Sequence, residues 1–318
     1  MSMNAQALAF AGSSTNRKEM PMQFDHLNPE SEDAARRLES YKNYRVMRAV
    51  PNAFSSMPDN GATPAGQCVA IVDMETSGLD PDRDKIIELA VMLVFVDDGG
   101  HVIGYAEPVS WLEDPGIPLE PNITMLTGLA NHHLVGHQIP DEFVVGMLDR
   151  ADLLVAHNCS FEIDWLERRY PSIAGKPWAC SMRDIPWLKL GLDGRAQTAL
   201  LMQHGWFSDA HRAAADVWSL FVLLNETRSG WLKGEPRTHL QRLLQAADTD
   251  TVMVEARGAP FSAKDRLKSR GYRWHAGPPK FWAKEIDAIA VEHEQTWFQI
   301  ERLPEPSLRT ITASERHR

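Results

Sequence analysis

Two stretches rich in β-branched residues, 68–73 and 86–96, restrict the possible folds of this chain more than any other feature. Each is apolar enough to be buried and too short to cross a bilayer as a helix, so both predict core strands. Two aspartates and two glycines at 97–100 indicate a tight turn, after which residues 101–108 can return as a third strand. A further strand at 152–156 alternates with helices. This order predicts an α/β fold in which helices flank a mixed central sheet.

Helices are predicted from apolar periodicity and from capping residues. Asn28 and Pro29 indicate the start of a helix over 29–48, and Ser208-Asp209 can cap one over 211–225. Further helices are expected at 141–148, 161–170, 197–204, 238–247, 263–270 and 287–298. In the C-terminal part, strands are expected at 251–257, 272–275 and 281–284.

Polar and Pro/Gly-rich stretches divide the chain into four parts. Residues 1–66 are predicted to form a disordered segment, a helix and a linker, and residues 67–228 form the main domain. Residues 237–302 are expected to form a small α+β module. Residues 303–318 are predicted to be a disordered tail.

Composition excludes several classes of protein. The 318 residues carry a net charge of −10, which argues against a protein that coats polyanions non-specifically. No apolar run is long enough to span a bilayer and no secretory signal is expected, so membrane contact is not expected. Three cysteines without metal-like spacing, Cys68, Cys159 and Cys180, predict reduced, buried thiols and a cytoplasmic location.

Acidic residues follow two of the predicted strands. Asp73 and Glu75 are two positions apart at the end of a strand, so they point to the same side, and such a pair suits Mg²⁺ or Mn²⁺. Glu162 falls in the first turn of a helix that follows a later strand. Asp216 interrupts the apolar last helix, and His211 stands at its start, where its pKa suits a general base. Each feature alone also fits a polar turn, a helix terminus or a capping histidine.

Together, three segments resemble the exonuclease motifs of the DEDDh family of 3′→5′ exonucleases. They are Asp73-Met74-Glu75-Thr76, Ala156-His157-Asn158-x-x-Phe161-Glu162 and His211-Arg212-Ala213-x-x-Asp216. They occur in the family's order, and the resemblance covers residues 68–225. The chain is similar in this respect to the epsilon proofreading subunit of bacterial DNA polymerase III and to related stand-alone bacterial exonucleases.

The resemblance implies a ribonuclease-H-like exonuclease fold. It implies a 3′→5′ exonuclease that hydrolyses DNA in proofreading or repair and releases nucleoside 5′-monophosphates. The expected partners are single-stranded or 3′-terminal nucleic acid and a DNA polymerase or repair complex. The implied site consists of Asp73, Glu75, Glu162 and Asp216 as ligands of two divalent cations, Mg²⁺ or Mn²⁺, His211 as the base, and Thr76 and Leu79 as contacts of the terminal nucleotide.

One position departs from the family pattern, which has aspartate where this chain has Glu162. Glutamate keeps the charge but is one methylene longer. Asp164 is a second candidate, although two positions along a helix turn it away by roughly 200°. His157 lies inside the second motif, and we expect it to be a hydrogen-bonded structural histidine.

Residues 251–285 contain eight basic and three acidic residues, interleaved with aromatic ones. Such a pattern suits single-stranded nucleic acid, and the alternative is an aromatic module core with a solvated basic rim. Two other functions of the whole chain stay open: an RNA-trimming 3′→5′ exoribonuclease, and a nucleic-acid-binding scaffold with a weakened site. The aromatic residues of this stretch are Phe261, Tyr272, Trp274, Phe281 and Trp282.

Overall fold

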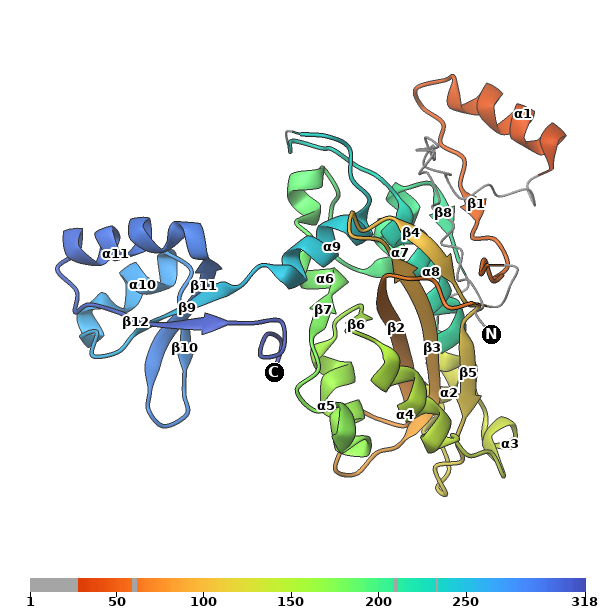
Figure 1. Ribbon diagram of the computed structural model, residues 1–318, viewed down its shortest axis with the longest axis horizontal. Helices are drawn as coiled ribbons and strands as arrows, with labels where there is room; N and C mark the ends of the chain where they lie inside the picture. Colours follow the sequence, from red (N-terminus) through yellow and green to blue (C-terminus); the bar gives the residue numbers. More distant parts are fainter. Residues whose placement is uncertain (1–27, 59–61, 209–210, 233) are drawn as a thin grey trace, which may run out of the picture. The chain divides into compact units, whose positions relative to one another are not determined.

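The computed structural model describes residues 28–58, 62–208, 211–232 and 234–318 (Figure 1). The chain separates into two compact units, residues 1–46 and residues 47–318. Within the described ranges, no helix is both long and apolar enough to cross a membrane. The disorder predicted for the first residues falls on positions 1–27, which lie outside the described residues.

The described part of the smaller unit contains helix α1 (Pro29–Glu39). Asn28 caps it as predicted, because its Oδ1 accepts from the backbone N–H groups of Glu30 and Ser31 at 3.0 and 3.1 Å. The helix ends at Glu39, well before residue 48. Among its side chains only Ala35 is buried, so no packed face extends the helix further.

The larger unit contains a central sheet with the strand order β4-β3-β2-β6-β7. β2 (Gln67–Thr76) and β3 (Ile86–Val96) pair antiparallel along their lengths. β6 (Leu153–Ala156) and β7 (Trp178–Cys180) run parallel to β2. The sheet is therefore mixed and is flanked by helices, which confirms the α/β class and the ribonuclease-H-like arrangement expected from the sequence (Figure 1).

The strand predicted at 101–108 is two strands. β4 (Val102–Tyr105) and β5 (Val109–Leu112) both pair with β3, at different positions along it. Pro108 lies between them, and proline has no N–H to donate to a strand ladder. The chain therefore leaves the sheet at this point and rejoins it.

Alternate residues of β2 face opposite sides of the sheet. Ala70, Val72 and Met74 pack in one core with side chains of α4 (Asp141–Arg150) and α5 (Ser160–Arg169). The residues between them point to the other face, which α8 (Ala213–Asn225) covers along β2 and β3. Figure 1 shows α4 in front of the sheet and α8 behind it.

The linker predicted before the main domain packs onto it. Nε1 of Trp218 donates to the carbonyl of Pro51 at 2.7 Å, and the ring of Phe54 contacts Trp218 edge-on. The short strands β1 (Arg48–Ala49) and β8 (Trp206–Phe207) form a parallel pair. Residues from Met47 onward therefore belong to the larger unit. Other helices of this α/β domain include α2 (Pro121–Thr127), α3 (Asn131–Leu134), α6 (Ser181–Asp184) and α7 (Gln197–Gln203).

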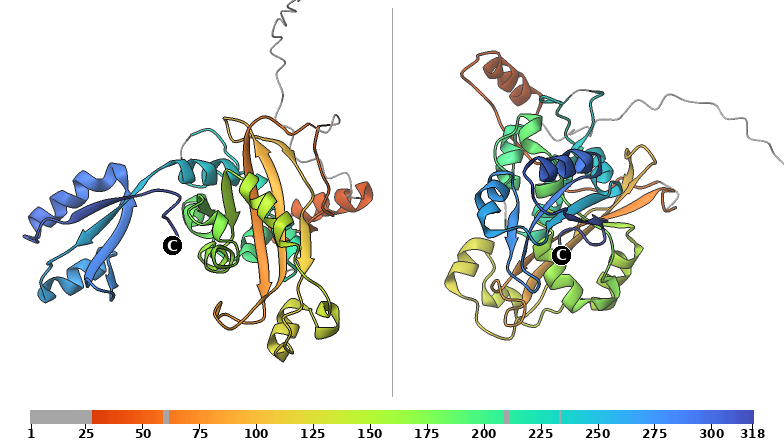
Figure 2. Two further views of the ribbon diagram at one scale, coloured as in Figure 1. Left: turned by 60° about the horizontal axis from the view of Figure 1, so that its bottom comes forward. Right: turned by 90° about the vertical axis from the view of Figure 1, so that its left-hand side faces the viewer.

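The C-terminal module combines an antiparallel sheet with two helices (Figures 1 and 2). Its core includes Val254 on β9, Leu267 on α10 and Phe298 on α11. β10 and β11 form the predicted hairpin. In the strand order β10-β11-β9-β12, the strands are β9 (Thr251–Ala256), β10 (Arg273–His275), β11 (Phe281–Asp287) and β12 (Ser307–Ile311), and the helices are α10 (Lys264–Ser269) and α11 (Val291–Ile300).

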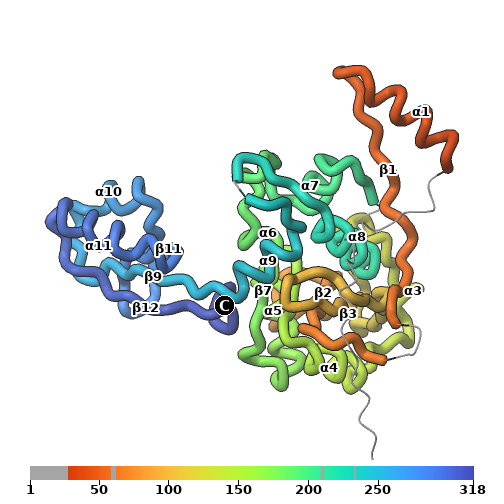
Figure 3. Tube along the Cα trace, turned by 45° about the horizontal axis from the view of Figure 1, so that its top comes forward, coloured from red at the N-terminus to blue at the C-terminus, as the bar shows by residue number. Residues whose placement is uncertain are grey.

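The prediction of a disordered tail at 303–318 is wrong. β12 pairs antiparallel with β9 at the edge of the module's sheet, and its last residue, Ile311, is buried. The chain then returns to the α/β domain, where the backbone N–H of Trp178 donates to the carbonyl of Ala313 at 3.2 Å (Figure 3). The tail is ordered by these distant partners, which leave no periodic signal in its own sequence.

Helix α9 (His239–Asp248) packs on the α/β domain and not within the module predicted for 237–302. It contacts β7, α6 and α8, and its apolar face is buried. Thr238 and Gln241 form a capping box at its start. The compact core of the C-terminal module therefore begins with β9.

Two buried histidines meet beside α9. Nε2 of His239 lies 3.0 Å from Nε2 of His204, and neither side chain is exposed by more than 4%. Burial, with the nearby Arg228, lowers the pKa of His204 to about 4. Burial and the adjacent His204 lower the pKa of His239 to about 3. Both rings are therefore neutral at neutral pH, and one donates to the other.

We expect these histidines to destabilise the folded protein as the pH falls from about 6.5 to about 4, because the unfolded chain then binds protons that the folded chain does not. Each histidine makes the free energy of unfolding fall more steeply with decreasing pH, by up to about 1.4 kcal/mol per pH unit. In His239→Gln, the free energy of unfolding in urea should fall less over this range. His293→Gln, a change at an exposed histidine of α11, should keep the wild-type slope; equal slopes in both variants contradict the prediction.

Candidate active site

Three carboxylates from distant parts of the chain meet at the end of β2. Side-chain oxygens of Asp73, Glu75 and Asp216 lie within 4.8 Å of one another. Asp73 and Glu75 share the face of β2 that α8 covers, and Asp216 stands in the first turn of that helix. The fold thus brings together three of the residues predicted from the sequence.

Glu162 approaches the same cluster from α5. Its side chain is buried, with 4% exposure, and it lies close enough to raise the pKa of Asp73. Asp164, the other candidate, points away: its side chain is 65% exposed and lies 3.9 Å from Arg168. Of the two acidic residues considered at this position, Glu162 is therefore the one near the cluster.

His211 precedes α8 and is tied to Asp216. Its backbone N–H donates to Oδ2 of Asp216 at 2.8 Å, and its φ of 72° places it in the left-handed region, which is uncommon for histidine. The side chain is exposed. The turn therefore holds His211 beside the carboxylates while its ring stays accessible to solvent.

An ion pair between buried Glu88 and half-exposed Arg212 fixes this turn to the sheet, and neither residue was predicted from the sequence to have a role in the site. Glu88 is 1% exposed and lies directly opposite Glu75 in the β2–β3 ladder. Nε and Nη2 of Arg212 donate to its two oxygens at 3.0 and 3.1 Å, and the N–H of Ala213 donates at 3.3 Å. Glu88 is the lone charged residue of an otherwise apolar strand. This isolated charge was the feature of the sequence that could have indicated a role for it.

The acidic side chains are costly to ionise together. Burial raises the pKa of Asp73 well above its usual range, and the charge of Glu162 adds to this effect. Burial, followed by Asp216, raises the pKa of Glu75 to about 7. Burial also raises the pKa of Glu162 to about 8, and the pKa of Asp216 rises for the same reason. At neutral pH such a cluster needs protons or cations to compensate its charge.

The donor set fits hard divalent cations. The converging atoms are carboxylate oxygens, which are the ligands that Mg²⁺ and Mn²⁺ prefer. Oε2 of Glu162 is buried and has no hydrogen-bond partner among the residues that the structure describes. A buried carboxylate oxygen without a partner is unfavourable unless a cation or proton accompanies it.

The loop after β2 carries the two residues predicted to contact a substrate. Thr76 is buried, and its hydroxyl donates to the carbonyl of Gly78 at 2.5 Å. A Cβ at Gly78 would lie 2.3 Å from the carboxylate of Asp84, so a larger residue there would have to displace that side chain. Leu79 is 84% exposed next to this turn. The apolar side chain of Leu79 is thus available for contact with a substrate. At Thr76, only the backbone is available.

His157 uses both ring nitrogens within the fold. Nδ1 is paired with the Ser181 hydroxyl at 2.8 Å, and Nε2 lies 2.7 Å from the carbonyl of Arg195. Burial lowers its pKa, although the contact with Arg195 opposes the shift. These contacts are those of the structural histidine that the sequence analysis expected.

The chain is similar to two kinds of solved exonuclease structure. One is Exonuclease X in complex with 5′ overhanging duplex DNA, with 25% identity and a TM-score of 0.38; the match covers 49% of this chain and 88% of that one. Another is E. coli Exonuclease I in complex with a dA16 oligonucleotide, with 14% identity and a TM-score of 0.43, covering 79% of this chain and 66% of that one.

No family model matches the chain. Over 102 residues it is 30% identical to the PolC-type DNA polymerase III of Streptococcus pyogenes serotype M5 (strain Manfredo) and to that of serotype M1. This match covers 31% of the chain and spans 7% of the length of each relative. The chain resembles DEDD-type 3′→5′ exonucleases. The resemblance predicted from the three motifs is thereby confirmed.

The raised pKa of Glu162 predicts that this residue makes the metal-free folded protein less stable as the pH rises. A carboxyl whose pKa is raised from 4.5 to about 8 by folding loses its contribution to stability as the pH rises through that window. Glu162→Gln should therefore melt at the same temperature as the wild type near pH 4.5 and at a higher temperature near pH 8, both in chelator.

Asp164→Asn is the matched control, because Asp164 is an exposed acidic residue of the same helix. It should follow the wild type at both pH values. The assignment fails if Glu162→Gln also follows the wild type at pH 8. Added Mn²⁺ should reverse the order at pH 8, since it stabilises the wild type more than the variant.

Proposed function

We propose that this protein is a metal-dependent 3′→5′ exonuclease that removes nucleotides from the 3′ ends of DNA and releases nucleoside 5′-monophosphates. The observation that carries the proposal is the convergence of Asp73, Glu75 and Asp216, with Glu162 and His211 beside them. A surface cluster of acidic residues would relax apart in solvent. Here the residues are held together by the sheet and two helices despite their mutual repulsion.

The four carboxylates would hold two divalent cations, which would activate water and offset the negative charge that develops during phosphodiester hydrolysis. The role of His211 follows from its position. Its exposed ring stands beside Asp216, where it can take the proton of the attacking water. The water oxygen forms a bond to phosphorus, the bond from phosphorus to the 3′ oxygen breaks, and that oxygen takes up a proton as the new 3′ hydroxyl.

The Glu88–Arg212 ion pair positions this base. It anchors the residue between His211 and α8 to β3, so the turn cannot swing away from the carboxylates. Leu79 supplies an apolar surface against which the terminal base can stack or wedge. A polymerase or repair complex that presents frayed 3′ ends is the partner we propose.

In the nuclease assay, a single-stranded DNA labelled at its 5′ end should be shortened stepwise from the 3′ end in Mn²⁺ and left intact in chelator. His211→Gln should lower kcat by roughly 10²–10⁴-fold, the usual contribution of a general base. Asp216→Asn should abolish product. His132→Gln, a change at an exposed histidine outside the site, should retain wild-type activity.

The same assay on 5′-labelled RNA separates the alternatives. Shortening of RNA alone favours an RNA-trimming exoribonuclease. Binding of either polymer without any product favours a scaffold. If His211→Gln and His132→Gln are equally active, the role of His211 as the base is refuted.

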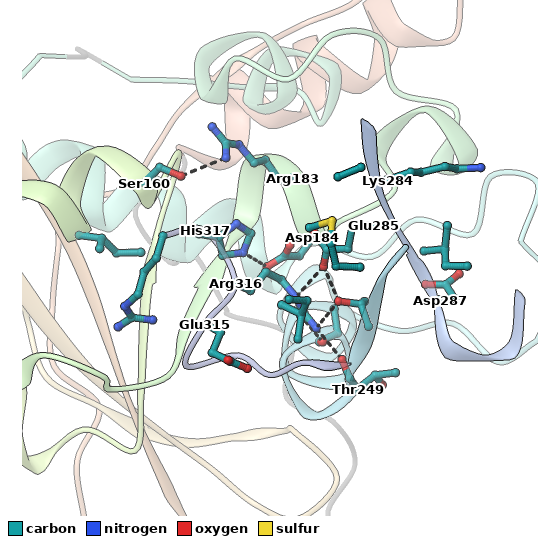
Figure 4. A pocket seen from close by; sticks show the side chains of 18 of the residues that line it. Ser160, Arg183, Asp184, Thr249, Lys284, Glu285, Asp287, Glu315, Arg316 and His317 are labelled. Carbon is teal, nitrogen blue, oxygen red and sulfur yellow. Dashed lines mark hydrogen bonds and ion pairs between the residues drawn. The ribbon is translucent and has the colours of Figure 1, made fainter. Parts of the chain in front are cut away.

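We further propose that the C-terminal module holds the substrate strand. A cleft of about 1940 Å³ lies between α5 and α6 of the α/β domain and the module (Figure 4). One wall carries Arg183, which donates to Ser160 Oγ at 3.0 Å at the start of the helix that bears Glu162. The facing wall carries Trp274, which is 51% exposed. Basic residues that line the cleft include Arg168, Arg195, Arg273, Lys284 and Arg309, and acidic residues such as Asp164, Glu167 and Glu285 line it as well.

Trp274→Ala should raise the KM for single-stranded DNA and leave kcat nearly unchanged, because the ring contacts bases away from the reacting phosphate. Base–aromatic stacking of about 1–3 kcal/mol corresponds to a KM increase of roughly 5- to 150-fold. Phe261→Ala is the matched control: its ring is 87% exposed on the same module but does not line the cleft. Equal effects of the two changes contradict this use of the cleft.

A further inference from the structure

Two of the three cysteines meet behind the candidate active site. Cys159 stands directly before α5, and Cys180 is the last residue of β7; both are fully buried. The sulfurs of Cys159 and Cys180 lie within 4.8 Å of each other. The third cysteine, Cys68, is buried at the start of β2 and is not part of this pair.

A histidine from the C-terminal end of the chain completes the group. His317 offers a ring nitrogen such that the ligand atoms of Cys159, Cys180 and His317 all lie within 4.8 Å of one another. Its side chain is 5% exposed. Three segments that are far apart in the sequence therefore bring two sulfurs and one imidazole to one buried point.

Asp184 orients the histidine in the way that carboxylates orient metal-ligating histidines. Its Oδ2 lies 3.0 Å from Nε2 of His317 (Figure 4). The same oxygen also accepts from the backbone N–H of Cys180 at 2.8 Å. In metal sites, a ligating histidine almost always donates its second ring N–H to such a partner. The contact fixes the ring and leaves Nδ1 for a metal.

The backbone of His317 is held in an unfavourable conformation. Its φ is 74°, in the left-handed region that residues other than glycine seldom adopt. Such strain persists only where the surroundings over-determine it, and it is concentrated at functional sites. The surroundings here are Asp184 and the neighbouring Arg318, which donates to the carbonyl of Lys176 at 3.0 Å.

We propose that Cys159, Cys180 and His317 bind a thiophilic divalent cation, Zn²⁺ foremost, with water or Asp184 in the fourth position. Sulfur and imidazole donors select zinc, whereas the carboxylate cluster selects Mg²⁺ or Mn²⁺. Zn–S bonds of about 2.3 Å in a tetrahedral site place two sulfurs roughly 3.8 Å apart. Closing the present group around the ion therefore needs shifts of at most about 1 Å.

The bound ion would fasten the C-terminal tail to the α/β domain. The tail follows β12, the edge strand of the module, and its contacts with α9 and β7 are hydrogen bonds and ion pairs, of which Arg316 to Thr249 is one at 2.7 Å. A metal bond to His317 would make this attachment much stronger. The inference concerns structure and metal binding, so it stands or falls independently of the proposed nuclease activity.

Co²⁺ titrated into the full metal-free chain, with Mg²⁺ in excess to fill the carboxylate cluster, tests the site. Cobalt–thiolate bonds absorb in the near ultraviolet and cobalt–carboxylate bonds do not. We expect this absorption to saturate at a single Co²⁺ per chain and to disappear when Zn²⁺ is added. Asp184→Asn should weaken the affinity roughly 10–100-fold, and His317→Gln should weaken it at least as much.

Cys180→Ser should abolish the absorption, and Cys68→Ser, the same change at the remote cysteine, should leave it intact. His317→Gln keeps the experiment decisive if a cysteine variant fails to fold, because His317 lies in the tail and not in the sheet core. The proposal is overturned if the wild type shows no thiolate absorption, if His317→Gln leaves the affinity unchanged, or if Cys68→Ser removes the signal.

Discussion

Repulsion among buried carboxylates is the constraint on which the candidate site depends. Asp73, Glu75 and Asp216 would separate if the chain allowed it, and the fold prevents this by rigid means. The long antiparallel pairing of β2 with β3 fixes the first two, and the packing of α8 along both strands fixes the third. The Glu88–Arg212 ion pair then holds the turn before α8 against the sheet. The stabilisation that the apolar core gives to the folded state thereby outweighs the repulsion among these carboxylates.

The sequence was sufficient for the elements whose signal is local. The strand Ile86–Val96 was predicted to the residue, because an apolar run bounded by turn residues has few alternatives. Asp73, Glu75 and Asp216 could be brought together in advance only because three ordered motifs resemble a known family. Glu88 was missed because its partner, Arg212, lies more than a hundred positions away, so no local pattern connects them.

Elements that depend on distant partners were beyond such reasoning. The apolar face of the helix over 239–248 could pack on either the α/β domain or the C-terminal module. Only its observed contacts with β7 and α8 show that it belongs to the α/β domain. β12 is a short polar strand whose order comes from pairing with β9. Cys159, Cys180 and His317 illustrate the same limit, since metal-ligand spacing rules describe neighbours along the chain and these three residues meet only in the folded structure.

The two connections between the C-terminal module and the α/β domain leave side by side. Thr251 opens β9 and Ile311 closes β12, and these two residues are direct partners in the ladder. The module is thus joined to the α/β domain at two neighbouring strand ends, away from the strand β2 and the helix α8 that carry Asp73, Glu75 and Asp216. The two proposed roles, holding a substrate strand and cleaving its end, therefore fall on parts of the fold that substitutions can alter one at a time.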